Sequence, residues 1–144
     1  MLITAGLTLL LVVLSALVHY EALRLCNEKL QRLEWIAKRA KVLLAVGVAF
    51  CSHLVQIALF AGAYWLLHGT ALGNLRGQIN SPGMSFLYFS TETYTSLGFG
   101  DVYPVGAMRL IAGIEALVGL LMISWTASFT YLEMSRYWVG RSDR

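Results

Sequence analysis

The sequence predicts an all-α membrane protein in which three helices cross the bilayer and a further short helix enters it and returns. Hydrophobic residues make up 58% of the 144 residues and charged residues only 13%, whereas a soluble domain usually carries about 25% charged residues. Three apolar runs reach the length of about 20 residues that a helix needs to cross a bilayer. The stretch TETYTSLGFGDVYP interrupts the second and third runs with carboxylates, hydroxyls and glycines, so it cannot itself be a crossing helix.

The first run covers residues 1–25 and predicts an N-terminal transmembrane helix. No basic residue precedes the run and no small-x-small cleavage site follows it, so we expect a retained helix rather than a cleaved secretory signal. The end of the run becomes polar through His19, Tyr20, Glu21 and Arg24. We therefore expect His19 to lie at the inner edge of the membrane.

Residues 26–41 form a basic connection in which leucines, a tryptophan and an isoleucine stand among the charges. Its basic residues are Lys29, Arg32, Lys38, Arg39 and Lys41. We expect a short amphipathic helix on the inner leaflet, or alternatively a specific site for anionic lipids or a regulatory ligand. Because positive residues stay on the cytoplasmic side, this connection and the tail at 135–144 should be cytoplasmic. The N-terminus should then lie on the outer side. We expect the protein to be an integral protein of the plasma or inner membrane.

The second and third runs cover residues 42–68 and 108–134, and the segment between them has two parts. Ser81 and Pro82 suit the start of a helix over 82–95, which is too short to cross a bilayer. The next part, 96–101, contains two glycines, whose backbone angles are closed to most other residues. Glycine at alternate positions lets an extended strand turn successive carbonyls the same way. Such backbone survives at membrane depth only when protein buries it or when it lines a water-filled path.

The string SLGFGD at 96–101 resembles the T-V-G-Y-G-D filter of the potassium channel family, which follows a short pore helix. The longer string is similar to V-E-T-A-T-T-V-G-Y-G-D-L-Y-P of the small bacterial proton-gated channels. The matching residues are Glu92, Thr93, Thr95, Gly98, Gly100, Asp101, Tyr103 and Pro104. The resemblance covers about 42–134, with an outer helix, a pore helix, a filter and an inner helix. The first helix falls outside it.

The resemblance implies a potassium-selective channel that conducts K⁺ passively through a tetrameric pore. It implies K⁺ ions in the filter as the only cofactor, bound by backbone carbonyls and one hydroxyl. The carbonyls belong to Ser96, Leu97, Gly98 and Phe99, the hydroxyl belongs to Ser96, and Gly100 completes the filter. Thr95 would end the pore helix behind them. Because one pore strand cannot enclose an ion, the unit should be a homotetramer with membrane lipids around it.

The resemblance also assigns supporting residues. Glu92 would sit behind the filter and share a proton with Asp101, and two carboxyl groups that close should raise one pKa. Phe99 lacks the hydroxyl that ties the family's filter to its pore helix, and Tyr88 stands where a tryptophan often donates that bond. The gating hinge and cavity residues implied for the inner helix are Gly119, Ile123 and Ala127.

Polar residues within the apolar runs each have two interpretations. Glu115 either tunes ion occupancy or senses pH, as buried membrane carboxylates often do, or it fixes packing by hydrogen bonding to the pore helix. His53 and Gln56 share a helix face and either bond between helices or sense protons. At 1.5 Å rise per residue, His19 and His53 should differ in depth by roughly 8 Å, so we expect them to hold no haem. We also expect no other organic cofactor.

Three other functions stay open beside a potassium channel. The first is a weakly selective cation channel, and the second is a non-conducting scaffold or regulatory subunit with a vestigial pore. An enzyme is the third, but the sequence has no HExxH or GxSxG motif and no nucleophile–base pair. The basic residues cluster at predicted membrane edges and not on a soluble face, so we expect no nucleic-acid partner.

Overall fold

The computed structural model describes residues 2–79 and 81–138, and it confirms an all-α membrane architecture. In chain order the elements are α1 (Leu2–Arg32), α2 (Lys38–Leu67), β1 (Gly73–Gly77), α3 (Pro82–Tyr94), β2 (Val102–Gly106) and α4 (Met108–Trp138). Within the described residues, α1, α2 and α4 are long and apolar enough to cross a membrane. The short α3 begins at the predicted residue, and the end of the tail, 139–144, lies outside the described residues.

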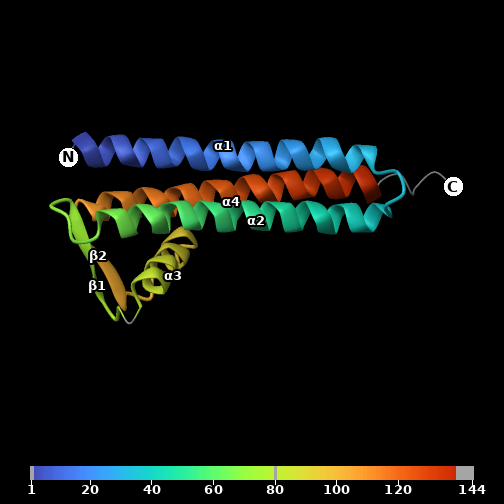
Figure 1. Cartoon of the computed structure of the whole chain (residues 1–144). Helices are drawn as coiled ribbons and strands as arrows, with labels where there is room; N and C mark the ends of the chain where they lie inside the picture. Colours follow the sequence, from blue (N-terminus) through green and yellow to red (C-terminus); the bar gives the residue numbers. More distant parts are fainter. Residues whose placement is uncertain (1, 80, 139–144) are drawn as a thin grey trace.

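The three long helices lie side by side, and α1 packs against both α2 and α4 (Figure 1). The start of α1 lies at the same end of the bundle as the two strands, and the connection between α1 and α2 lies at the other end, near the end of α4. The predicted outer loop and the basic connection are therefore at opposite ends of the molecule. Three helices that cross the membrane in alternating directions require this separation.

The expected amphipathic helix at 26–41 is wrong. α1 continues to Arg32 and α2 begins at Lys38, so that only residues 33–37 connect them. Packing explains the continuation, because Cys26 and Leu30 are buried in a cluster with Ala45 of α2. Burial of these apolar side chains against α2 stabilises a continuous α1 more than it would a separate helix on the leaflet surface.

The strands β1 and β2 were not predicted from the sequence. They pair antiparallel, with Gly73 opposite Gly106 and Arg76 opposite Tyr103. Gly77 has a φ of +114°, and a Cβ there would lie 1.9 Å from the Asp101 carbonyl oxygen. The paired strands β1 and β2 thus join the chain that precedes α3 to the chain that follows the glycine-rich strand, residues 96–101. They hold the two ends of the re-entrant segment together.

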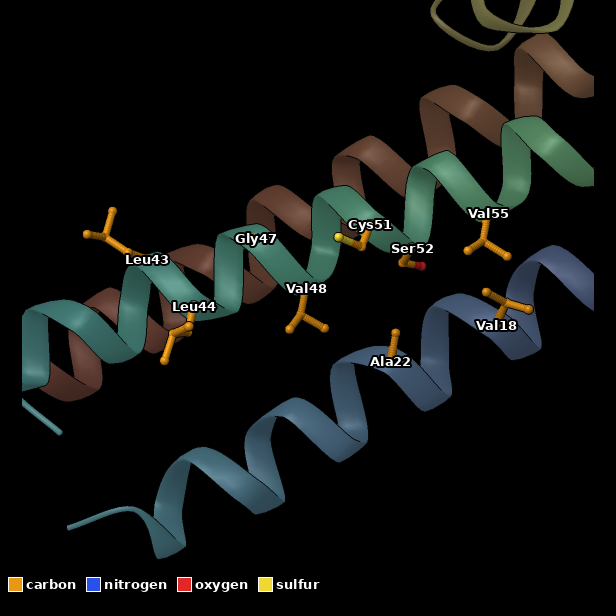
Figure 2. Close-up of a pocket in the computed structure, with 9 residues that line it drawn as sticks. All are labelled: Val18, Ala22, Leu43, Leu44, Gly47, Val48, Cys51, Ser52 and Val55. Carbon is orange, nitrogen blue, oxygen red and sulfur yellow. The ribbon is translucent and has the colours of Figure 1, made fainter. Parts of the chain in front are cut away.

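An apolar groove of about 480 Å³ separates part of α1 from α2 (Figure 2). Its lining residues are Val18, Ala22, Leu43, Leu44, Gly47, Val48, Cys51, Ser52 and Val55. Small side chains on both helices leave this space open. Direct polar contacts between α1 and α2 lie at the end of the groove near Ser52, beside His19.

Candidate ion-conduction site

The strand that follows α3 has an alternating backbone. α3 ends at Tyr94, and Thr95 caps it with its N–H bonded to the Thr91 carbonyl at 3.1 Å. Beyond the cap, Ser96, Gly98 and Gly100 have φ values of 59°, 57° and 79°. Left-handed residues at every second position turn successive carbonyl oxygens toward one side, which an ordinary strand does not do. Such a backbone can present its carbonyl oxygens as a row on one side, and in the described part of the chain the carbonyls at 96–99 accept no main-chain hydrogen bond.

The glycine-rich strand is exposed on this single chain. Residues 95–100 are all exposed, and the large apolar side chains of Leu97 and Phe99 are 59% and 68% exposed. Unpaired carbonyl oxygens at membrane depth need either a protein partner or a water-filled path.

Behind this strand, Glu92 is buried with 3% of its surface exposed. Its carboxylate accepts the Phe99 N–H at 3.2 Å, and its main-chain carbonyl accepts the Leu97 N–H at 2.8 Å. Burial raises the pKa of Glu92 above its ordinary value, although the hydrogen bond from Phe99 opposes the rise. Glu92 therefore takes up a proton at higher pH than an ordinary glutamate.

Tyr88 supplies part of the contact between α3 and the following strand that Phe99, which has no hydroxyl, cannot make. The Tyr88 hydroxyl lies 3.1 Å from both carboxylate oxygens of Asp101 and donates to them. Asp101 and Glu92 act on each other electrostatically, and Tyr88 interacts with both carboxylates, while Glu92 also accepts the Phe99 N–H. The pore helix thus holds the strand at Phe99 and at Asp101. The shared proton between the two carboxyl groups stays a prediction.

Glu115 joins three elements at the back of α3. Its carboxylate oxygens lie 2.5 Å from the Ser90 hydroxyl of α3 and 2.5 Å from the Tyr64 hydroxyl of α2. The side chain is fully buried, so it faces neither a channel nor solvent on this chain. The geometry matches the packing alternative, because removing either donor would leave a buried carboxylate oxygen unpaired.

Gly119 allows α4 to pass directly beneath the end of α3. A Cβ at this position would lie 1.9 Å from the Tyr94 carbonyl oxygen. The contact is a reason for glycine in addition to the predicted hinge, which stays a prediction. Ile123 and Ala127 lie on an exposed face of α4, and their place in a cavity stays a prediction.

Two predictions about the histidines are wrong. His19 is fully buried and not at the membrane edge. Its ring centroid lies 5.1 Å from that of His53, so the two depths cannot differ by about 8 Å. The reason is that α1 runs on to Arg32, which places His19 deeper than a helix ending at residue 25 would.

His53 bonds between helices, as one of its two interpretations expects. Its Nδ1 lies 2.9 Å from the Tyr94 hydroxyl of α3, and its Nε2 lies 2.9 Å from the Thr126 hydroxyl of α4. The described residues contain no group of three or more His, Cys, Asp or Glu side chains able to hold a metal ion. The sequence interpretation missed Tyr94 and Thr126 because nothing marked them as partners of a histidine.

Three long apolar helices, a re-entrant helix and an exposed carbonyl-bearing strand define a membrane channel. A family model described as an ion channel matches residues 53–134, more than half of the sequence, and the chain belongs to this ion channel family. The matched region begins within α2, so α1 lies outside it.

Two curated relatives match short parts of the chain. Protein LctB of Bacillus caldotenax is 56% identical over 36 residues, which are 25% of this chain and 27% of that protein. Protein LctB of Geobacillus stearothermophilus is 44% identical over 50 residues, which are 35% of this chain and 37% of that protein. The match therefore spans well under half of either relative. No solved structure matches the chain significantly.

Proposed function

We propose that four copies of this chain form a potassium-selective channel that conducts K⁺ passively. The observation that carries the proposal is the left-handed backbone at Ser96, Gly98 and Gly100, in a strand that follows the re-entrant helix α3 and is hydrogen-bonded to Glu92 of that helix. K⁺ would be coordinated by the carbonyls at 96–99 and by the Ser96 hydroxyl. Carbonyl oxygens in such a row replace the water shell of a dehydrated cation.

Exposure supports an assembly of four. A cation without its water shell needs oxygens from all sides, and one strand supplies only one side. Fourfold symmetry places four equivalent strands around one axis. The exposed side chains of Leu97 and Phe99 would then be covered by neighbouring subunits, and the exposed face with Ile123 and Ala127 would line the cavity.

Charge supports a cation as the permeating species. α3 ends at Tyr94, directly before the strand, so the negative end of its dipole points toward the proposed path. Glu92 lies behind the strand, and Asp101 lies at its end. By the distribution of basic residues, the strand end of the bundle faces outward and the connection at 33–37 faces the cytoplasm. Basic residues near that connection are candidate contacts for anionic lipids.

Ion flux into liposomes that hold the purified protein tests this function. Flux driven by a potassium gradient, blocked by barium and absent with sodium supports a selective filter. Equal sodium flux favours a weakly selective cation channel, for which the missing hydroxyl at Phe99 is the structural reason. Absence of flux for both ions contradicts conduction and favours a scaffold or regulatory subunit.

Replacing Glu92 with alanine should alter the steady-state open probability more than the selectivity. The change deletes the acceptor of the Phe99 N–H but leaves every ion-facing carbonyl in place. Loss of a buried hydrogen bond costs about 1–3 kcal/mol, which corresponds to about fivefold or more in an open–closed equilibrium. Glu92→Gln is the matched control, because its amide oxygen still accepts that hydrogen bond. Single-channel recordings in which the permeability ratio shifts and the open probability does not would contradict this role.

A further inference from the structure

The apolar groove between α1 and α2 is separate from the proposed ion path. Its lining residues all belong to these two helices, and none comes from the re-entrant segment or from α4 (Figure 2). In Figure 1, α1 lies on one side of α2 and α4, and α3 lies on the other. The side chains of Leu43, Leu44 and Val55 are exposed, so on this chain the groove opens sideways at membrane depth.

The groove has the length and width of a single hydrocarbon chain. Along α2 its lining runs from Leu43 to Val55, which is about 18 Å at a rise of 1.5 Å per residue. One leaflet contributes about 15 Å to a hydrocarbon core of about 30 Å. A helix of that length, about 10 Å across, would need far more than the groove's volume of about 480 Å³. The groove therefore suits an acyl chain and not a partner helix.

Small side chains create this space, and the groove offers no polar partner to a ligand. Ala22 on α1 and Gly47 and Cys51 on α2 lie where larger residues would fill it, and a Cβ at Gly47 meets nothing within 4 Å. The Ser52 hydroxyl is already bonded to His19 at 3.1 Å. A polar ligand would leave its polar groups unpaired here, whereas a hydrocarbon chain would not.

Each helix continues its groove face into a basic residue near the connection at 33–37. On α2, Arg39 precedes Leu43 by four residues, and on α1, Lys29 follows Ala22 by seven. Residues four or seven apart lie on one face of a helix, so both basic residues lie beyond the same end of the groove. Both are exposed, and neither forms a salt bridge with another described residue.

The charge at this end of the groove is positive. The carboxylates of Glu21 and Glu28 are paired with Arg24, and that of Glu133 is paired with Arg136. Glu34, within the connection, is the other carboxylate at this end of the described chain. In the proposed orientation this end faces the cytoplasm, where the leaflet carries anionic lipids. The planar guanidinium of an arginine suits a phosphate group.

We propose that the groove binds one acyl chain of an anionic phospholipid whose phosphate is held by Lys29 and Arg39. The acyl chain fills the space that small residues leave between α1 and α2, and the headgroup lies at the level of the connection. The site gives a ligand to α1, which lies outside the matched family region. The proposal depends on the groove and its charges and not on ion conduction.

Native mass spectrometry of the full chain, purified in detergent and stripped of lipid, tests the site. The two probes are phosphatidylglycerol and phosphatidylcholine with the same acyl chains, so that they differ in the headgroup alone. Phosphatidylglycerol should bind about tenfold more tightly or better, since each basic residue near a membrane surface strengthens binding of an anionic lipid about fivefold.

Replacing Lys29 and Arg39 together with glutamine should remove this preference. The change leaves the groove intact, so phosphatidylglycerol should then bind no better than phosphatidylcholine. Arg76→Gln is the matched control, because Arg76 is exposed on β1 at the opposite end of the molecule. This control should keep the full preference for phosphatidylglycerol.

Gly47→Leu should weaken the binding of both lipids by about fivefold or more, because the leucine takes the place of one or two methylene groups of the acyl chain. Leucine favours a helix over glycine, so the fold should persist. Gly6→Leu is the matched control, since Gly6 lies on an exposed part of α1 outside the groove and a Cβ there meets nothing within 4 Å. Lipid binding should be unchanged in it.

Phosphatidylglycerol with a photoreactive diazirine on one acyl chain then locates the bound lipid in nanodiscs. The label should concentrate on peptides that contain residues 18–22 and 43–55. It should fall in Gly47→Leu and persist in Gly6→Leu.

The contrary outcomes are distinct. Equal affinity for the two lipids, or a preference that survives the loss of Lys29 and Arg39, would overturn the proposal at the headgroup. Unchanged affinity in Gly47→Leu, or label spread evenly over the lipid-facing helices, would overturn it at the groove. Dissociation of subunits in Gly47→Leu with unchanged lipid binding would assign the groove to a second copy of the chain and would also overturn it. Ion flux enters none of these measurements, so they decide the lipid site even if the protein does not conduct.

Discussion

Gly98→Asp should abolish potassium flux while the protein still inserts into the membrane and assembles. Gly98 has a φ of +57° in the middle of the proposed filter. A side chain there costs about 1–2 kcal/mol of backbone strain, and fourfold symmetry would repeat the strain and the carboxylate in each subunit. Four carboxylates at one level of the path would distort the carbonyl row and trap a cation. Liposome flux measures the loss, and chemical cross-linking checks assembly.

Gly83→Asp is the matched control for this change. Gly83 lies in the first turn of α3, and a Cβ there meets nothing within 4 Å. An acidic residue near a helix N-terminus is tolerated or stabilising. Flux should therefore persist in Gly83→Asp. Normal potassium flux through Gly98→Asp would refute the assignment of the filter, and equal loss in both variants would attribute the effect to added charge.

Gly119→Ala should destabilise the subunit and reduce its assembly. The new methyl group would meet the Tyr94 carbonyl oxygen at 1.9 Å, well inside van der Waals contact, so α3 and α4 would have to separate. Overpacking of this kind costs about 1–3 kcal/mol or more in each chain. Because the Tyr94 hydroxyl is hydrogen-bonded to His53 and Gln56 of α2, the displacement should also disturb the contact between Gln56 and His19 of α1. Thermal unfolding in detergent measures the effect.

Gly113→Ala lies on the same helix and introduces the same methyl group without a contact within 4 Å. Alanine favours a helix by about 1 kcal/mol over glycine, so this variant should be as stable as the natural chain or more stable. Equal stability of Gly119→Ala and Gly113→Ala would show that the close approach of α3 and α4 is not needed.

The sequence predicted the features that depend on local composition. Three apolar runs were enough to predict three crossing helices, because length and apolarity decide whether a helix can cross a bilayer. Glycine at 98 and 100 predicted an unusual backbone, which the structure has at both positions and also at Ser96. These features are local, since each depends on residues adjacent in the chain.

The features that the sequence did not predict depend on contacts between distant residues. The strands β1 and β2 pair residues that are 25 to 33 positions apart, such as Arg76 with Tyr103. The Thr126 hydroxyl lies 3.2 Å from Nε2 of His19, which is 107 positions away in the chain. No local pattern in either segment indicates such a partner.

One signal for the polar contacts of His19 was nevertheless present in the sequence of α1. Its buried polar residues recur on one helical face, at Thr4, Thr8, Ser15 and His19. In a crossing helix, polar residues on a single face indicate the side that packs against other helices. Read in this way, His19 points toward the bundle and not toward the membrane edge, although its partners on α2 and α4 would still be unknown.

The reversal potential of the purified protein in a planar bilayer, with potassium on one side and sodium on the other, tests the central claim most directly. A filter of backbone carbonyl oxygens, as proposed for residues 96–99, should pass potassium and exclude sodium. If only potassium carries the current, the reversal potential should lie far from zero. Gly98→Asp should show no such current. A reversal potential near zero would show that the strand at 96–101 does not select between the two ions, and it would contradict a potassium-selective channel.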